Sequence, residues 1–150
     1  MLKDFPKLIL SIGLCLGAGF IGSIFTVSSI TTWYVTLNKP SFSPPNWVFG
    51  PVWTMLYALM GISLYLVWLK QRIPTVFWIQ LFLNVIWSII FFGMRNPLLA
   101  LVDIVALWIA IILTIKAFSK INKLSAYLLY PYLAWVSFAS ILNFAIVILN

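Results

Sequence analysis

The sequence predicts an all-α membrane protein, a bundle of five transmembrane helices with a structured loop between the first helix and the second. Composition is the first observation behind this prediction. Of the 150 residues, 64% are hydrophobic and 7% are charged, and the mean hydropathy is +1.13. A soluble domain carries roughly 25% charged residues. This chain cannot cover itself with a polar surface, so its solvent is lipid. Its length fits one domain, residues 1–150.

The length of the apolar segments is the second observation. A helix needs about 20 apolar residues to cross a hydrocarbon core about 30 Å thick. Because the apolar runs are continuous and do not alternate, helices are favoured over a β-barrel. Because the last three connections are short, consecutive helices are expected to pack as antiparallel neighbours. The predicted helices are 8–28, 47–69, 75–92, 98–118 and 125–149.

The basic residues, which give a net charge of +7, predict the orientation. Five spans place most of them on one side of the membrane, and only Lys39 and Arg95 on the other. The positive-inside rule then predicts a cytoplasmic N-terminus, with the C-terminus and the 29–46 loop on the opposite side. Because the cations lie at helix ends, no nucleic-acid partner is expected. The larger group is Lys3, Lys7, Lys70, Arg72, Lys116, Lys120 and Lys123.

The 29–46 loop is the only long connection, and Pro40, Pro44 and Pro45 stiffen it. A stiff loop loses less entropy on ordering, which suits a lid or a binding rim. A packed cap that only seals the bundle explains the same residues, and both interpretations stay open.

Helical spacing predicts an inner face on three of the spans, where aromatic rings alternate with amide and hydroxyl groups. Polar groups gain nothing by facing lipid tails, so these stripes should point inward. They would form a pocket for a large, mostly apolar ligand. The alternative is hydrogen bonding between helices without any ligand. The stripes are Gln80, Asn84, Trp87, Ser88 and Phe91; Asp103, Leu107, Ala110 and Thr114; and Trp135, Phe138, Ala139, Leu142 and Asn143.

Two features of the spans leave alternatives open. Asp103 is a carboxylate within a span, which costs about 2.5–3.5 kcal/mol on insertion scales. Either it has a structural role, in a hydrogen bond or at the start of a helix, or it takes part in ligand or proton chemistry. Gly13 and Gly17 form a GxxxG pattern that permits close helix packing. Packing within the bundle is the favoured interpretation, and packing between protomers is the other.

The residues needed for conventional catalysis are missing. The chain has no histidine, one cysteine and two acidic residues. This excludes histidine metal sites and catalytic triads, and the sequence contains no glycine-rich phosphate loop. We therefore expect no metal site, no resident cofactor and no conventional enzyme, but a protein equipped to bind.

Three separated motifs carry a resemblance to a known family. Residues 33–53 follow WYxxLxKPxxxPPxxxFxxVW, residues 83–93 follow LNxxWSxxFFG, and residues 128–143 read LLYPYLAWVSFASILN. Together they resemble the TspO/MBR family of tryptophan-rich sensory proteins and translocator proteins, also described as peripheral-type benzodiazepine receptors. The resemblance runs from about Gly17 to the end of the chain.

The resemblance implies a five-helix bundle, commonly a homodimer, with a ligand cavity that lies beneath the first loop and opens on its side. Family ligands include porphyrins and other tetrapyrroles, sterols, isoquinoline carboxamides and benzodiazepines. The expected function is binding or sensing of a tetrapyrrole such as protoporphyrin IX. The positions expected to contact the ligand are Trp33, Tyr34, Pro44, Trp53, Tyr57, Asn84, Trp87, Trp135, Phe138, Ala139 and Leu142.

Two alternative functions accompany this expectation. One is light-dependent breakdown of bound porphyrin, in which Trp53 and Trp135 would take part. The other is transport of porphyrin or sterol. The chain lacks the Tyr-then-basic pattern that animal members carry at the end of the fifth helix, since Phe144 follows Asn143 and no basic residue follows Lys123. Tetrapyrrole binding is therefore favoured over sterol transport, and the chain resembles a bacterial member.

Overall fold

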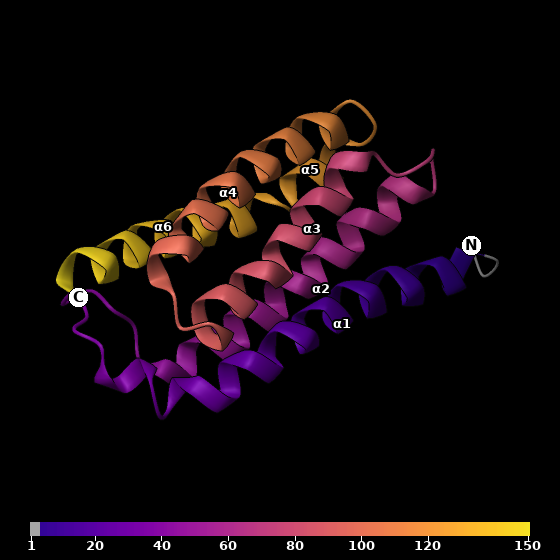
Figure 1. The fold of residues 1–150 in the computed structure, drawn as a ribbon. Helices are drawn as coiled ribbons and strands as arrows, with labels where there is room; N and C mark the ends of the chain where they lie inside the picture. The colour runs from indigo at the N-terminus through magenta and orange to yellow at the C-terminus, as the bar shows by residue number, and fades with distance from the viewer. Residues whose placement is uncertain (1–3) are drawn as a thin grey trace.

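A computed structural model describes residues 4–150, so Lys3, which belongs to the larger basic group, lies outside the described residues. Within that range the predicted architecture is confirmed: five helical segments of 19 to 27 residues are apolar and long enough to cross a membrane. They lie side by side as an elongated bundle (Figure 1). The long helices are α1 Phe5–Ile30, α2 Phe49–Trp68, α3 Thr75–Ser88, α4 Pro97–Ser119 and α6 Tyr130–Leu149.

Four shorter elements complete the fold. Two single turns, η2 Tyr34–Thr36 and η3 Asn46–Val48, lie in the long loop, and the helix α5 Lys123–Tyr127 precedes α6. The fourth is η4 Ile89–Gly93, a π-helical turn that continues α3.

The fifth span differs from the single helix predicted over 125–149. It begins at Lys123 and is divided into α5 and α6 at Leu128 and Leu129. Pro131 explains the division, because it has no N–H to donate to the carbonyl of Tyr127 and its ring crowds the preceding turn. The first helix is also longer than predicted, by about one turn at its N-terminal end.

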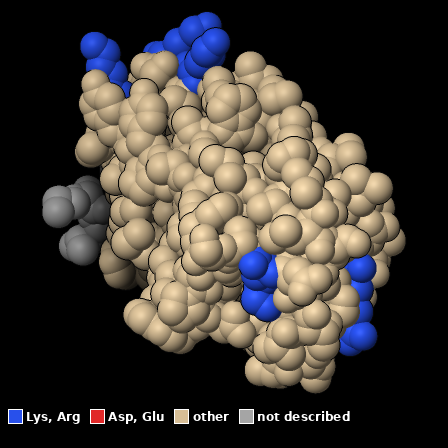
Figure 2. Space-filling model, turned by 90° about the vertical axis from the view of Figure 1, so that its left-hand side faces the viewer, with Lys and Arg blue, Asp and Glu red and all other residues tan. Residues whose placement is uncertain are grey.

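The two ends of the bundle collect different parts of the chain (Figure 1). At one end Lys7 lies 5.3 Å from the ring of Trp68, and Lys70 Nζ donates to the carbonyl of Ile121 at 3.2 Å. At the other end lie the long loop and Asn150. The described basic residues therefore group as the sequence predicts, while the cytoplasmic identity of their end stays a prediction. Figure 2 shows basic side chains in separate patches on an otherwise uncharged surface.

The first helix packs closely on the second in its N-terminal half. A Cβ placed on Gly61 would lie 2.5 Å from Ile12 Cα, so α1 and α2 can meet here only because residue 61 has no side chain. Gly13 and Gly17 instead lie on the exposed face of α1, with nothing within 4 Å of an added Cβ. The favoured interpretation of this pair as a contact within the bundle is therefore wrong.

Substituting Gly61 with alanine should destabilise the bundle. The added methyl meets the backbone of α1, and relieving such an overlap costs about 1–3 kcal/mol. The matched control is Gly13→Ala, where an added Cβ has free space. Thermal unfolding in detergent should show a lower midpoint for Gly61→Ala and an unchanged or higher one for Gly13→Ala. Equal midpoints in the two variants would contradict the close contact of α1 with α2.

Candidate ligand-binding cavity

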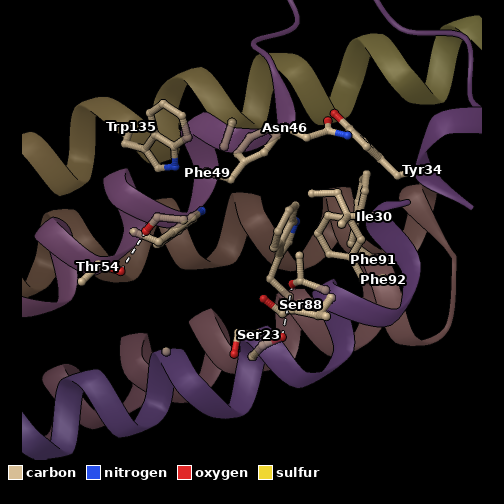
Figure 3. Close-up of a pocket in the computed structure, with 18 of the residues that line it drawn as sticks. Ser23, Ile30, Tyr34, Asn46, Phe49, Thr54, Ser88, Phe91, Phe92 and Trp135 are labelled. Atoms are coloured by element: carbon tan, nitrogen blue, oxygen red, sulfur yellow. Dashed lines mark hydrogen bonds between the residues drawn. The ribbon is translucent and has the colours of Figure 1, made fainter. Parts of the chain in front are cut away.

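A cavity of about 460 Å³ lies between α1, α2, η4 and α6, in the half of the bundle near the long loop. Its walls are mostly apolar, and most of the rings that line it come from α2, η4 and α6. In the view of Figure 3, Ser23 and Ser88 lie on one side of the cavity, and Phe49 and Trp135 lie on the other. Its volume falls in the range of pockets that enclose small organic ligands.

Two tryptophans and a tyrosine form one wall. Trp53 and Tyr57, one helical turn apart on α2, are stacked with centroids 5.6 Å apart and planes at 28°. Trp135 from α6 meets Trp53 edge-on, at 6.4 Å and 90°. Phe49 closes the row against Trp135 at 6.1 Å. Offset and edge-to-face arrangements are the ones favoured by the ring quadrupole, so this wall is internally stable.

The opposite wall depends on the π-helical turn η4. Its widened turn includes the bond from Met94 N–H to the carbonyl of Ile89, at 2.8 Å. The extra residue lets the consecutive residues Phe91 and Phe92 both reach the cavity. Phe91 stacks on Trp87 at 4.9 Å and 21°. Such π turns are frequent at functional sites, and hydropathy gave no signal for this one.

Tyr34 closes the cavity at the loop end. Its side chain is 2% exposed, and its ring packs against Phe49, Phe91 and Phe92 at 6.3, 6.2 and 5.8 Å. Burial raises the pKa of Tyr34, and a hydrogen bond with Ser43 partly offsets the rise. Lys39 Nζ lies 4.8 Å from the ring centroid in a cation–π contact, and it also donates to the carbonyl of Tyr34 at 3.0 Å.

A buried hydrogen-bond network holds Tyr57, one of the residues that line the cavity. Tyr57 donates its hydroxyl proton to Asn84 Oδ1, and Asn84 Nδ2 donates to the Tyr132 hydroxyl at 2.7 Å. Tyr132 in turn donates to Gln80 Oε1 at 2.8 Å. These four side chains join α2, α3 and α6. Asn84 is thus placed as the link between two tyrosines, and it does not line the cavity.

The first helix forms a wall that the sequence analysis missed. Gly19, Gly22, Ser23 and Thr26 all line the cavity, and their spacing of i, i+3, i+4 and i+7 places them on one helical face. A stripe of small and hydroxyl-bearing residues carries little hydropathy contrast in an apolar helix, which is why it was missed. Searching for small residues at this spacing, as was done for Gly13 and Gly17, would have found it.

The structure divides the predicted ligand contacts into two groups. The residues that line the cavity are Tyr34, Trp53, Tyr57, Trp87, Trp135, Ala139 and Leu142. Trp33, Pro44, Asn84 and Phe138 lie outside its lining. Trp33 packs behind the wall against Phe91 at 5.6 Å, and Phe138 contacts Phe42 of the loop at 6.2 Å.

Two buried polar atoms bear on the chemistry. Trp135 Nε1 has no hydrogen-bond partner among the described residues, whereas Trp87 Nε1 donates to Asn143 Oδ1 at 3.0 Å. The indole N–H of Trp135 is itself buried, so it is an unsatisfied donor within the wall rather than a group exposed to the cavity. Asp103 Oδ2 also lacks a partner within residues 4–150, but Asp103 does not line the cavity. The helix-start role considered for it belongs to Asn96, whose Oδ1 accepts from the N–H of Leu99 at 3.0 Å.

Five apolar spans and an aromatic cavity within the bundle define an integral, multi-pass membrane protein with an internal cavity. Residues 11–149 match the TspO/MBR family. A protein named Tryptophan-rich protein TspO from Archaeoglobus fulgidus is 54% identical over 149 residues, covering 96% of this chain and 97% of that protein. The protein of the same name from Chlorobaculum tepidum is 52% identical and covers all of this chain and 99% of its own.

The similarity extends to animal proteins. The protein named Translocator protein from Homo sapiens is 43% identical over 135 residues, covering 85% of this chain and 80% of the human protein. The chain belongs to the TspO/MBR family, which confirms the resemblance inferred from the three motifs. Membership supports a membrane sensory or translocator role that involves hydrophobic ligands and lipid.

Replacing Asn84 with leucine should weaken the bundle. The change leaves the buried hydroxyl of Tyr57 without its acceptor, and an orphaned polar group of this kind costs about 1–2 kcal/mol. Gln71→Leu, in the exposed turn after α2, is the control. Thermal unfolding in lipid nanodiscs should show a lower midpoint for Asn84→Leu alone. An unchanged midpoint would show that the network does not hold the helices.

Proposed function

We propose that this protein is a membrane-embedded binding and sensory protein for tetrapyrroles of the protoporphyrin IX type, with the aromatic cavity as its site. The observation that carries the proposal is the aromatic lining: Trp53, Tyr57 and Trp135 on one wall, and Trp87 and Phe91 on the other. A flat macrocycle offers two large apolar faces, and burying aromatic area dominates the free energy of such binding.

The polar groups of the cavity are few and partly paired within the protein. Ser23 and Thr26 donate their hydroxyl protons to the carbonyls of Phe20 and Gly22, and Ser88 lines the same side of the cavity. No acidic residue lines the cavity within the described chain, so an anionic substituent on the ligand meets no like charge there. Asn46, exposed at the loop end, adds an amide near the surface, where such a substituent could stay hydrated.

The homodimer that the family resemblance implies stays a prediction, as does the cytoplasmic N-terminus. Trp33, predicted as a direct contact, is assigned in this proposal to a position behind the wall, against Phe91, and Pro44 lies outside the lining.

Trp53→Ala should weaken protoporphyrin IX binding while the bundle still folds. Losing one stacked indole removes about 1.5–3 kcal/mol of buried apolar contact, so the Kd should rise about ten- to hundredfold. The titration can be followed by quenching of the remaining tryptophans in nanodiscs. Trp47→Ala is the matched control, because Trp47 is 74% exposed and lies outside the cavity lining. Equal affinities in the two variants would count against this site.

A second candidate function is light-dependent oxidation of the bound porphyrin. It is favoured by the pairing of Trp53 with Trp135 in one wall, at 6.4 Å. The porphyrin absorbs the light, dioxygen serves as the oxidant, and the two indoles are placed to exchange an electron with the excited ring.

Illumination of the complex in air should then bleach the porphyrin absorption band faster than in free porphyrin at the same concentration. Trp135→Phe keeps an aromatic ring and should slow the bleaching to near the rate of free porphyrin. Bleaching that is equally fast in free porphyrin would exclude a role of the protein, and undiminished bleaching in Trp135→Phe would exclude a role of Trp135.

A further inference from the structure

Some residues that line the cavity are also among the most exposed side chains of the protein. On α1, Phe20 is 67% exposed and Val27 is 69% exposed, yet both line the cavity. On α2, Gly50 and Thr54 are likewise exposed and line it. Exposure this large in residues that also line the cavity indicates that the cavity is open beside them. These four residues therefore mark an opening between α1 and α2.

The packing of α1 explains why this gap exists. In its N-terminal half α1 contacts the backbone of α2, at Ile12 and Gly61. In its C-terminal half it packs on η4 instead: the Ser29 hydroxyl donates to the carbonyl of Phe92 at 2.7 Å, and a Cβ on Gly93 would lie 2.9 Å from the ring of Phe25. Because α1 changes its partner along its length, it diverges from α2 beside the cavity.

The side chains at the gap do not fill it. Gly50 has no side chain, and a Cβ added there would have nothing within 4 Å. Thr54 donates its hydroxyl proton to the carbonyl of Gly50 at 2.8 Å, so this hydroxyl at the edge of α2 is not a free donor (Figure 3). The edge therefore presents no unsatisfied polar group to an apolar molecule that passes it.

Asn46, which is also exposed and lines the cavity, lies one turn before Gly50 and borders the same gap, whereas the rest of the loop end is covered. Tyr34 fills it, and the loop over it is fixed by contacts with α6 and beyond. Asn38 N–H donates to Asn150 Oδ1 at 3.1 Å, and Asn150 Nδ2 donates to the carbonyl of Asn38 at 2.9 Å. A route through the loop would have to break these contacts, whereas the gap between α1 and α2 needs none broken.

The gap lies at a depth where its surroundings are hydrocarbon. The cavity-lining residues of α1 extend from Leu16, near the middle of the helix, to Ile30 at its end. At 1.5 Å per residue this stretch covers about 21 Å of a hydrocarbon core about 30 Å thick. Its neighbours Ile24 and Met55 are apolar and exposed. The gap itself, from Phe20 to Val27 on α1, is flanked by exposed apolar side chains, as expected for an opening that faces acyl chains.

We infer that ligand reaches the cavity sideways from the bilayer, through the gap between α1 and α2, and that its ligands are molecules already dissolved in the membrane. This inference rests on the proposed function for its porphyrin probe, and it differs from the expected opening on the side of the loop, which stays a prediction. Flat, apolar molecules that partition into the outer part of the hydrocarbon are the class selected by such a route.

The test compares adjacent exposed residues of α2, of which one borders the gap. Thr54→Phe narrows it, and Met55→Phe places the same ring on the lipid face outside the cavity lining. Each protein is reconstituted in phosphatidylcholine vesicles, and protoporphyrin IX binding is followed by tryptophan quenching in stopped flow. Thr54→Phe should slow binding about tenfold, and it should also slow release into excess empty vesicles, because a barrier acts in both directions. Met55→Phe should change neither rate.

The change in the release rate distinguishes a blocked route, which slows release, from a damaged site, which speeds it. Binding at the unsubstituted rate in Thr54→Phe, or faster release, would overturn the lateral route. Val27→Phe, with Ile24→Phe as its control, repeats the comparison from α1 and applies if Thr54→Phe does not fold.

A second measurement needs no porphyrin. Brominated acyl chains should quench the cavity tryptophans of the unsubstituted protein and of Met55→Phe more than those of Thr54→Phe, and equal quenching would contradict an opening to lipid. If the unsubstituted protein binds no protoporphyrin IX, the proposed function fails while this measurement still tests the gap.

Discussion

The hydrogen-bond network of Tyr57, Asn84, Tyr132 and Gln80 is the interaction on which the geometry of the site depends. In lipid there is little hydrophobic drive to bring apolar helices together, so polar pairing and close packing must do it. By fixing the hydroxyl of Tyr57, the network fixes its ring. Trp53 stacks on one part of that ring, and a Cβ on Gly19 would lie 2.5 Å from another. One buried network thus places α2, α3, α6 and the middle of α1.

Glycine residues set the shape of the cavity, because they let α1 approach its neighbours closely. Gly61 lets α1 lie against α2, and Gly93 lets the far half of α1 lie against η4. The same helix therefore closes one half of the bundle and leaves a gap in the other. The π turn of η4 adds Phe91 and Phe92 to the wall facing that gap. The cavity is the volume left by two different packing contacts of α1, with aromatic rings at its margin.

The sequence predicted those parts of the site that are marked by aromatic residues at helical spacing or by family motifs. Trp135, Ala139 and Leu142, at i, i+4 and i+7, were placed inward by spacing alone, and Trp53 and Tyr57 were named by the family resemblance. Each of the five lines the cavity. It did not predict the wall from α1, because glycine and serine in an apolar helix give no contrast in hydropathy. It also missed the π turn and the division of the fifth span. These depend on where a backbone hydrogen bond is lost, which periodicity does not record.

The loop that contains Trp33 and Pro44 has a different role from the one that its composition first suggests. Of the two interpretations, a lid and a packed cap, the contacts support the cap: Tyr34 is buried, Phe42 lies on Phe138, and Asn38 is bonded to Asn150. A cap that stays in place cannot select ligands by opening. Selection must then come from the walls of the cavity and from what the bilayer delivers to the gap. Proline serves this arrangement because it removes the backbone freedom by which the loop could leave its position.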